Sequence, residues 1–343
     1  MTEKVEAWAG SHRRASEQGG NAMKVGFIGL GNVGGQLSAS LLRNGVELMV
    51  RDLDKNMAQS LIDQGAGWAE SPKEMAAQCQ VVITCLPSPT ASATVLEAED
   101  GVLAGFAASG GSGKIWAEMS TTIDAEVKRI GEKIQALGAE PVDCPVSGGC
   151  HRAGTGNISI FAGGSRHAFE TMLPLLTKMG RRIIHTGALG SASVLKVVTN
   201  YLATANLVSC IEALVTCKMA GLDMNTSYEA IAASSGTSFV HETESQVILN
   251  GSRDISFTLD LVDKDLSIFT EFAERVGAQL ELSHFLLDIV RDGRAKYGDR
   301  EWSPNLIKRF EDKLGIEVLG SGFPSQMVDD EPEQAGFEVI PKR

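Results

Sequence analysis

The sequence has little that would bind a metal or form a disulfide framework. Its six cysteines include no C-x-x-C pair, and its six histidines show no metal-ligand spacing. The cysteines, most of which stand in apolar runs, are Cys79, Cys85, Cys144, Cys150, Cys210 and Cys217. We therefore expect buried free thiols, a cytoplasmic location and no bound metal.

Positive charge and long apolar runs are also scarce. Lysine and arginine number 31 against 43 aspartate and glutamate residues, which gives a formal net charge of −12. An acidic chain is a poor partner for nucleic acid or for an anionic membrane surface. No run of about 18 apolar residues occurs, so we expect no contact with a membrane. A small anionic substrate is compatible with this net charge, because a basic pocket can lie on an acidic surface.

The order of expected elements divides the chain into four parts. Residues 1–22 are polar and lack an apolar segment, so we expect a disordered leader that is not a secretory signal. Residues 23–188 alternate strands with helices, the pattern of βαβ units and a parallel sheet. Residues 189–317 show helical patterns only, beginning with a long apolar helix that contains no proline or glycine. Residues 318–343 are acidic and rich in glycine and proline, which predicts an irregular tail, either free or against a neighbouring subunit.

A glycine motif follows the first expected strand. "GLGNVG" has G-x-G-x-x-G spacing and stands between an apolar strand and a helical pattern, and Asp52 follows the second expected strand. Such glycines allow a tight turn and close approach of a pyrophosphate, and the acid binds a ribose 2′-hydroxyl. The adjacent Arg51 is an opposing signal, since an arginine there can bind a 2′-phosphate. We predict a Rossmann-type domain that binds NAD rather than NADP. Its expected cofactor contacts are Gly29, Leu30, Gly31, Asn32, Val33, Gly34 and Asp52.

Six stretches, in order along the chain, resemble one protein family. They are "GFIGLGNVGGQLSASLL" (26–42), "CLPSPT" (85–90), "EMSTT" (118–122), "DCPVSGGCHRAGTG" (143–156), "KVVTNYLATANLVSCIEAL" (196–214) and "FTLDLVDKDL" (257–266). Together they are similar to the β-hydroxyacid dehydrogenases, which include 3-hydroxyisobutyrate dehydrogenases and tartronate semialdehyde reductases. The resemblance implies an α/β fold in which a long helix joins a Rossmann-type domain to an all-α C-terminal domain. It also implies NAD-dependent interconversion of a small β-hydroxy acid and its semialdehyde or keto acid.

The resemblance gives roles to individual residues. Lys196 matches the general acid/base, and a lysine in a partly desolvated cleft has a lowered pKa that suits this task. Asn200 lies four residues further on, on the same helix face, where it can orient the lysine or the substrate. The expected substrate-binding residues are Ser120, Ser147, Gly148 and Gly149. The expected further cofactor contacts are Leu86, Pro87, Thr121 and Lys264, with helix capping as the alternative for Thr121 and a surface ion pair for Lys264.

Four further positions are candidates for the same cleft: Asp265, Arg152, Ser238 and His241. Arg152 and the preceding His151 follow the "SGG" loop, where an extra cation could hold a second acid group or a more polar substrate, or contact another subunit. The apolar long helix also predicts a homodimer or homotetramer.

Three alternative functions are disfavoured, two by the presence of Lys196 and one by the size of the helical domain. An imine reductase and a non-catalytic NAD-binding relative generally replace this lysine, so its presence argues against both. A phosphosugar oxidative decarboxylase usually has a larger helical domain than this chain provides. The sequence therefore favours the dehydrogenase.

Overall fold

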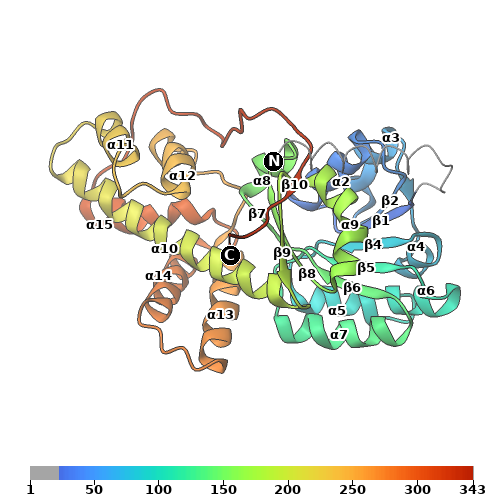
Figure 1. The fold of residues 1–343 in the computed structure, drawn as a ribbon. Coiled ribbons are helices and arrows are strands. Elements are labelled where there is room, and N and C mark those ends of the chain that lie inside the picture. Colours follow the sequence, from blue (N-terminus) through green and yellow to red (C-terminus); the bar gives the residue numbers. More distant parts are fainter. Residues whose placement is uncertain (1–22, 343) are drawn as a thin grey trace.

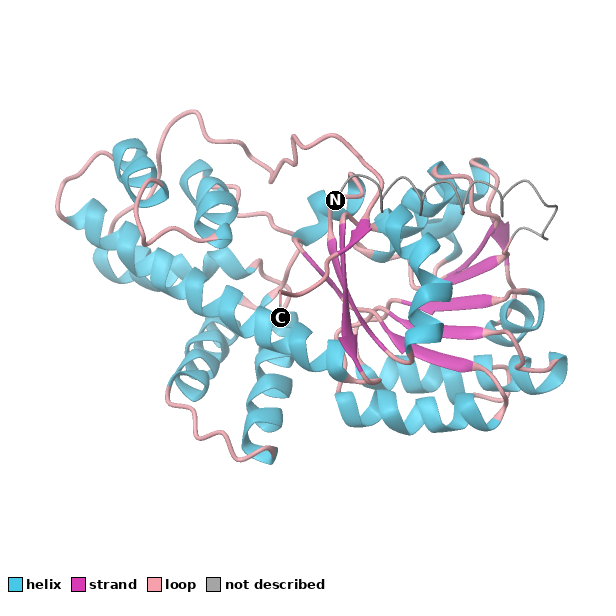
Figure 2. Cartoon of the chain, in the orientation of Figure 1, coloured by secondary structure: helices cyan, strands magenta, loops and turns pink. Residues whose placement is uncertain are grey.

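The structure, a computed structural model, describes residues 23–342, so the expected leader lies outside the described residues. A large sheet forms the centre of the first domain, and a helical second domain projects from it (Figures 1 and 2). The strands are β1 (Val25–Ile28), β2 (Leu48–Arg51), β3 (Gly67–Trp68), β4 (Val81–Thr84), β5 (Ile115–Glu118), β6 (Glu140–Asp143), β7 (Val146–Ser147), β8 (Ser159–Gly163), β9 (Arg182–Gly187) and β10 (Phe337–Glu338).

The sheet has the strand order β10-β9-β8-β6-β5-β4-β1-β2-β3, with β7 paired to β8. The part β3-β2-β1-β4-β5-β6 is parallel throughout and has the order of a Rossmann domain. Strand β8 runs antiparallel to β6 and β7, and β9 is parallel to β8. The carboxyl ends of β1, β4 and β5 therefore meet at one edge of the sheet, where open α/β sheets bind ligands.

Helices cover both faces of this sheet because its strands are buried on both sides. Val25 and Phe27 of β1 point into a core shared with α2 and α9, whereas Ile28 points into a core shared with α4, α6 and α7. The helices of the first domain are α2 (Gly34–Arg43), α3 (Gln59–Asp63), α4 (Pro72–Gln78), α5 (Pro89–Glu97), α6 (Val102–Ser109), α7 (Asp124–Ala136), α8 (Gly149–Gly154) and α9 (Arg166–Met179).

A buried carboxylate attaches the first domain to the long helix α10 (Ser191–Met219). The Asp143 Oδ1 atom accepts the Gly190 N–H at 2.8 Å, and Oδ2 accepts the Ser193 N–H at 2.7 Å and the Ser193 hydroxyl at 2.9 Å. These bonds satisfy N–H groups that the first turn of a helix leaves unpaired. Asp143 ends β6, so the position of α10 is fixed relative to the sheet.

Among residues 23–342, α10 is long and apolar enough to cross a membrane by length and composition, with a mean hydropathy of 1.4 in its most apolar window. In this structure α10 instead packs against β8 of the first domain and against α12 and α13 of the second. Its polar residues Lys196 and Asn200 bond within the protein, as in the core helix of a globular fold.

The second domain packs its helices around one half of α10. It contains α11 (Met224–Ala232), α12 (Phe239–Asn250), α13 (Leu259–Arg275), α14 (Leu282–Tyr297) and α15 (Lys308–Leu314). Its core joins Leu207, Ile211 and Leu214 of α10 to side chains of the other helices. Arg253 and Glu311 form a buried ion pair in this domain, in which Arg253 Nη2 donates to both carboxylate oxygens at 2.8 Å.

The C-terminal tail differs from the expected arrangement. It leaves the helical domain, returns to the first domain and adds β10 to the sheet, parallel to β9 (Figure 1, red). The sequence predicted no strand after residue 188, because β10 has only two residues. A strand this short forms because the edge of β9 offers hydrogen-bond partners, and it has no alternating pattern in the sequence.

Candidate active site

The glycine loop has the shape that a dinucleotide requires. Gly29 has a φ of 97°, and a Cβ there would lie 2.2 Å from the Cys85 carbonyl oxygen. A Cβ on Gly34 would lie 2.0 Å from the Gly29 carbonyl oxygen. At Gly31 nothing lies within 4 Å of that position, so the backbone is open to a phosphate. No side chain caps the amino end of α2, which leaves its N–H groups for the pyrophosphate.

Asp52 lies beside this loop at the end of β2. Its Oδ2 atom accepts the Leu30 N–H at 2.7 Å, which ties the loop to the strand that would bind the ribose. Arg51 is engaged elsewhere: it donates to the carbonyl oxygens of Ala69 at 3.0 Å and Glu70 at 2.6 Å. The carboxylate, and not the guanidinium, is therefore next to the glycine loop.

A chain of polar contacts connects α10, α13 and the end of β5. The Lys196 ammonium donates to Asn200 Oδ1 at 2.9 Å, and Asn200 Nδ2 donates to Asp265 Oδ2. The Asp265 Oδ1 atom forms an ion pair with Lys264 Nζ at 2.8 Å, and Lys264 donates to the Thr121 carbonyl oxygen at 3.1 Å. The fold thus brings together five residues that the sequence named from three separate stretches.

Lys196 is tuned for proton transfer by its surroundings. Burial lowers its pKa to about 8, while the nearby Asp265 opposes this shift and Lys264 adds to it. A lysine with this pKa exists in both protonation states near neutral pH, as a general acid/base requires.

Cys85 shows that Lys196 lies close to the other parts of the site. Burial raises the pKa of the Cys85 thiol to about 12, and Glu118, Cys150 and Lys196 are the groups near enough to act on it electrostatically. Cys85 follows β4 and touches the turn at Gly29, whereas Cys150 follows the "SGG" loop. Helix α8, which follows the "SGG" loop, also contacts α2 of the glycine loop, and β7 contacts α10, so these parts are neighbours in the fold.

The two glycines of the "SGG" loop have a backbone conformation that suits anion binding. Gly148 has a φ of 131° and Gly149 a φ of 88°, which are left-handed conformations that favour glycine. Consecutive N–H groups in such a turn form a concave site suited to an anion. Ser147 ends β7, and α8 begins directly at Gly149. The positions of these residues are compatible with carboxylate binding, and that role stays a prediction.

Ser120 has a supporting position at the carboxyl end of β5. Its hydroxyl oxygen accepts the Leu86 N–H at 2.7 Å, and its own N–H donates to Glu118 Oε1 at 2.8 Å. Leu86 in turn packs against the glycine loop, with Cδ2 3.0 Å from the Cβ position of Gly29, and Pro87 follows it. Ser120 therefore joins the ends of β4 and β5 near the glycine loop, and its contact with substrate stays a prediction.

Two of the candidate residues, His241 and Ser238, make contacts within the helical domain. His241 is 0% exposed, its Nε2 atom lies 3.0 Å from the Tyr228 carbonyl oxygen, and its ring stacks on Tyr228. It belongs to the domain core and does not line the cleft, contrary to expectation. Ser238 caps α12 by accepting the His241 N–H at 3.1 Å.

Two residues near the "SGG" loop were missed from the sequence. Phe239 stacks its ring below the guanidinium of Arg152, 5.0 Å from the ring centroid, and so joins α12 to α8. The signal available in the sequence was a phenylalanine directly after a serine, a residue type that favours helix caps. Met327 has its Cε atom 3.6 Å from the Cβ position of Gly149, and only the path of the tail places it there.

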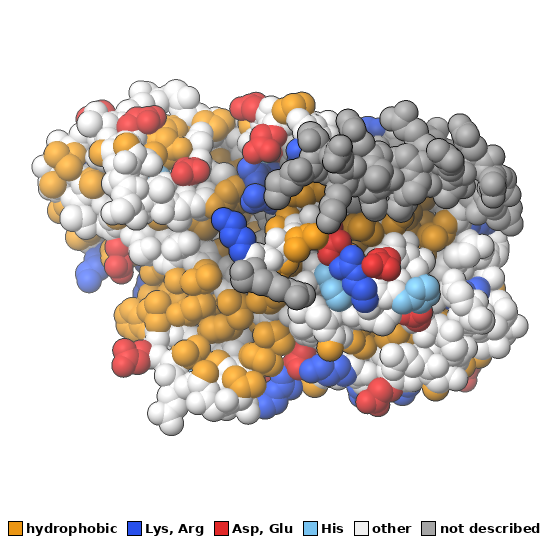
Figure 3. Space-filling view, in the orientation of Figure 1, with side chains coloured by type: hydrophobic (Ala, Val, Ile, Leu, Met, Phe, Trp, Pro, Cys, Tyr) orange, Lys and Arg blue, Asp and Glu red, His pale blue; other side chains and the backbone are white. Residues whose placement is uncertain are grey.

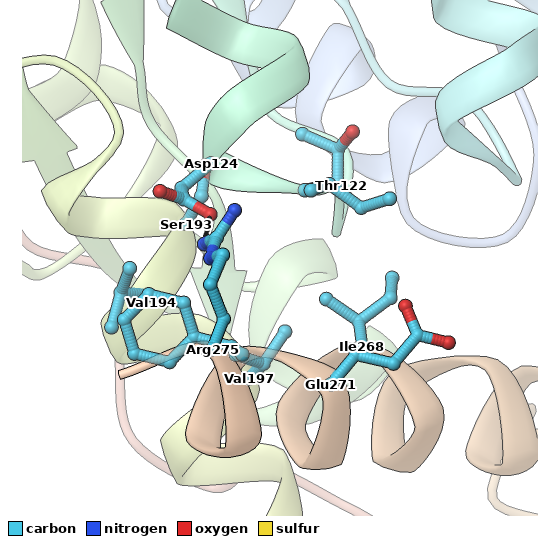
Figure 4. A pocket seen from close by; sticks show the side chains of 10 residues that line it. Thr122, Asp124, Ser193, Val194, Val197, Ile268, Glu271 and Arg275 are labelled. Carbon is cyan, nitrogen blue, oxygen red and sulfur yellow. Dashed lines mark hydrogen bonds and ion pairs between the residues drawn. The ribbon is translucent and has the colours of Figure 1, made fainter. Parts of the chain in front are cut away.

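A separate small cavity of about 130 Å³ lies between the start of α7, α10 and α13. Figure 4 shows Arg275 reaching from α13 toward Asp124 and Ser193 at one end, with Thr122 and Ile268 at the other. Neither Lys196 nor the glycine loop lines it, so it is not the candidate active site.

A Rossmann-type sheet with an open glycine loop, and a desolvated lysine facing the same region, define a nicotinamide-dinucleotide-dependent oxidoreductase. Within residues 23–342, no three metal-binding side chains cluster as an ion site would need.

Comparisons with known proteins agree with this class. The family model for the NAD-binding domain of 6-phosphogluconate dehydrogenase matches residues 24–187. The model described as NAD-binding of NADP-dependent 3-hydroxyisobutyrate dehydrogenase matches residues 190–309. The chain is 32% identical over 300 residues to 2-(hydroxymethyl)glutarate dehydrogenase of Eubacterium barkeri, covering 87% of this chain and 98% of that protein. It is 30% identical to 3-sulfolactaldehyde reductase of Escherichia coli, covering 81% and 93%. The crystal structure of 3-hydroxyisobutyrate dehydrogenase from Salmonella typhimurium superposes with a TM-score of 0.74 at 27% identity, covering 84% and 100%.

The chain therefore belongs to the β-hydroxyacid dehydrogenase family. The predicted fold class, the assignment as a hydroxyacid oxidoreductase and the use of a nicotinamide dinucleotide are confirmed.

Proposed function

We propose that this protein is an NAD-dependent dehydrogenase that interconverts a small β-hydroxy acid and its semialdehyde or keto acid, with Lys196 as the general acid/base. The observation that carries the proposal is the lowered pKa of Lys196, about 8, within the network of Asn200 and Asp265. The relatives above are named for 2-(hydroxymethyl)glutarate and 3-sulfolactaldehyde, both small anions with a hydroxymethyl or aldehyde carbon, which supports this substrate class.

Each residue has a defined task in oxidation. Bound NAD would supply the hydride acceptor. Neutral Lys196 takes the proton from the substrate hydroxyl. Asn200 accepts a hydrogen bond from Lys196 and so holds the amine at the required angle. The N–H groups of Gly148 and Gly149 hold the substrate carboxylate. In the reverse direction, protonated Lys196 returns the proton to the forming hydroxyl.

NAD is the proposed dinucleotide because Asp52 is the charged group beside the glycine loop. A carboxylate there accepts a hydrogen bond from a ribose hydroxyl and repels a 2′-phosphate. The opposing Arg51 is hydrogen-bonded to Ala69 and Glu70 instead.

The oligomeric state and the location are proposed as well. Figure 3 shows hydrophobic side chains gathered on the face around α10 and α14. The exposed large apolar residues on these helices include Leu195, Leu202 and Phe285. Burying them against another copy supports a homodimer or homotetramer. The six free cysteines support a cytoplasmic location.

The test is a panel of β-hydroxy acids assayed with NAD and with NADP. Lys196→Ala should abolish turnover of the best substrate while NADH binding, followed by fluorescence, is retained. Lys218→Ala, in the last turn of the same helix, is the matched control and should leave turnover unchanged. Full activity of Lys196→Ala would refute the assigned mechanism.

A further inference from the structure

The C-terminal segment 321–338, called the strap here, connects the two domains. At its start, Asn225 Nδ2 donates to the Ser321 carbonyl oxygen and Asn250 Nδ2 to the Phe323 carbonyl oxygen, both at 2.7 Å. Further on, Asn157 Nδ2 of the first domain donates to Asp329 Oδ2 at 2.8 Å. Figure 1 shows this segment crossing from the helical domain to the sheet, where it ends as β10. The second family model matches up to residue 309, so the strap lies beyond the residues it matches.

The strap passes over the loop that would hold the substrate carboxylate. The Met327 Cε atom lies 3.6 Å from the Cβ position of Gly149. The Arg152 Cδ atom lies 3.4 Å from the corresponding position of Gly148. Met327 of the strap, with His151 and Arg152 of α8, therefore borders the two glycines that are proposed to hold the substrate carboxylate.

Two carboxylates of the strap neutralise Arg152. Its Nη2 atom lies 3.4 Å from Glu331 Oε1, and its Nε atom lies 4.0 Å from Asp329 Oδ1. The Asp329 side chain is 3% exposed and also accepts hydrogen bonds from Thr155 and Asn157, so its position is fixed. The cation beside the substrate loop is consequently already paired with carboxylates of the same chain.

We propose that the strap determines substrate selectivity: Asp329 and Glu331 occupy Arg152 and so exclude β-hydroxy acids that carry a second acid group. A second carboxylate of the substrate would compete with two fixed carboxylates for one guanidinium, and like charges placed side by side are strongly unfavourable. A substrate with a single carboxylate uses only the glycine loop and avoids this repulsion. The inference rests on the proposed function and names the substrate class as monoanionic.

The test compares two pairs of neutralising substitutions in the full-length protein. The first is Asp329→Asn with Glu331→Gln, which frees Arg152. The control is Asp330→Asn with Glu317→Gln, which removes the same charge from two exposed residues that form no hydrogen bond or ion pair within the described residues. Glu331→Gln alone is a further variant, because a side chain 63% exposed can be replaced without loss of folding.

The readout is the ratio of kcat/KM for 2-(hydroxymethyl)glutarate to that for 3-hydroxyisobutyrate. The first pair should raise this ratio about tenfold, the effect of roughly one favourable charge contact. Glu331→Gln should raise it less, and adding Arg152→Gln should abolish the gain. An unchanged ratio, or an equal rise in the control, would overturn the proposal, since the second result means that only net charge matters.

A binding measurement separates this proposal from the proposed function. Calorimetry with the inert pair glutarate and isobutyrate, on the NAD-saturated protein, should show the same change in preference. If the wild type oxidises no acid of the β-hydroxy acid panel, the proposed function is wrong, and the binding ratio still decides the role of the strap. If the wild type oxidises 3-hydroxyisobutyrate but neither ratio responds, the strap proposal alone is wrong.

Discussion

Substitution of Asp265 tests how the site sets the protonation of Lys196. Burial lowers the pKa of Lys196 to about 8, and the Asp265 carboxylate works against that shift. Asp265→Asn keeps an oxygen that can accept from Asn200 but removes the negative charge. The pKa of Lys196 should therefore fall further in this variant, because less electrostatic stabilisation of the ammonium remains.

The size of the wild-type effect follows from the two pKa values. An amine with a pKa of about 8 is about 10% neutral at pH 7, whereas one at the ordinary 10.5 is about 0.03% neutral. Burial thus makes the neutral base about 300-fold more abundant at pH 7. Since oxidation needs the neutral amine, kcat/KM for oxidation should rise with pH and level off above about pH 8. Reduction needs the ammonium and should fall through the same inflection.

The assay is kcat/KM in both directions between about pH 6 and about pH 10. Asp265→Asn should move both inflections to lower pH. Asp260→Asn, on the same helix but paired with the exposed Arg300, is the control and should leave them in place. An oxidation profile that still rises at about pH 10, or an inflection that moves upward in Asp265→Asn, would refute the assignment of Lys196 as the titrating group.

Three further substitutions test the supporting structure. Gly34→Ala places a methyl group 2.0 Å from the Gly29 carbonyl oxygen, so NADH affinity measured by fluorescence should fall at least about tenfold; unchanged affinity would exclude the tight helix–strand contact. Asp143→Ala leaves buried donors at Gly190 and Ser193 unpaired and should lower the free energy of unfolding by about 3 kcal/mol in urea titrations, with a smaller loss for Asp143→Asn. Asp52→Asn should shift the kcat/KM ratio of NAD to NADP toward NADP by about tenfold, and a ratio that stays constant would contradict the role of this carboxylate.

The parts of the fold that sequence analysis anticipated are those with local signals. The glycine loop requires a strand before it and a helix after it, and both are present as β1 and α2. The second strand was expected directly before Asp52 and is observed there, at Leu48–Arg51. The two-residue strands β3 and β10 carry no periodic pattern and were not anticipated.

The candidate site shows the same division. Lys196 and Asn200 are four residues apart on one helix, so their contact follows from helical geometry. Asp265 reaches Asn200 from another helix, and the family resemblance suggested only that it lies nearby. His241 was placed wrongly because nothing in its local sequence shows that its ring faces Tyr228 rather than the cleft.

The sequence by itself determined the glycine spacing, the acid after the second strand and the helical register of the catalytic pair. These features depend on covalent geometry and on neighbours a few residues away. Only the tertiary structure decided that burial brings the pKa of Lys196 to about 8 and that the strap pairs Asp329 with Arg152. Desolvation and charge pairing depend on which distant segments exclude water from a group, and that is set by how the whole chain packs.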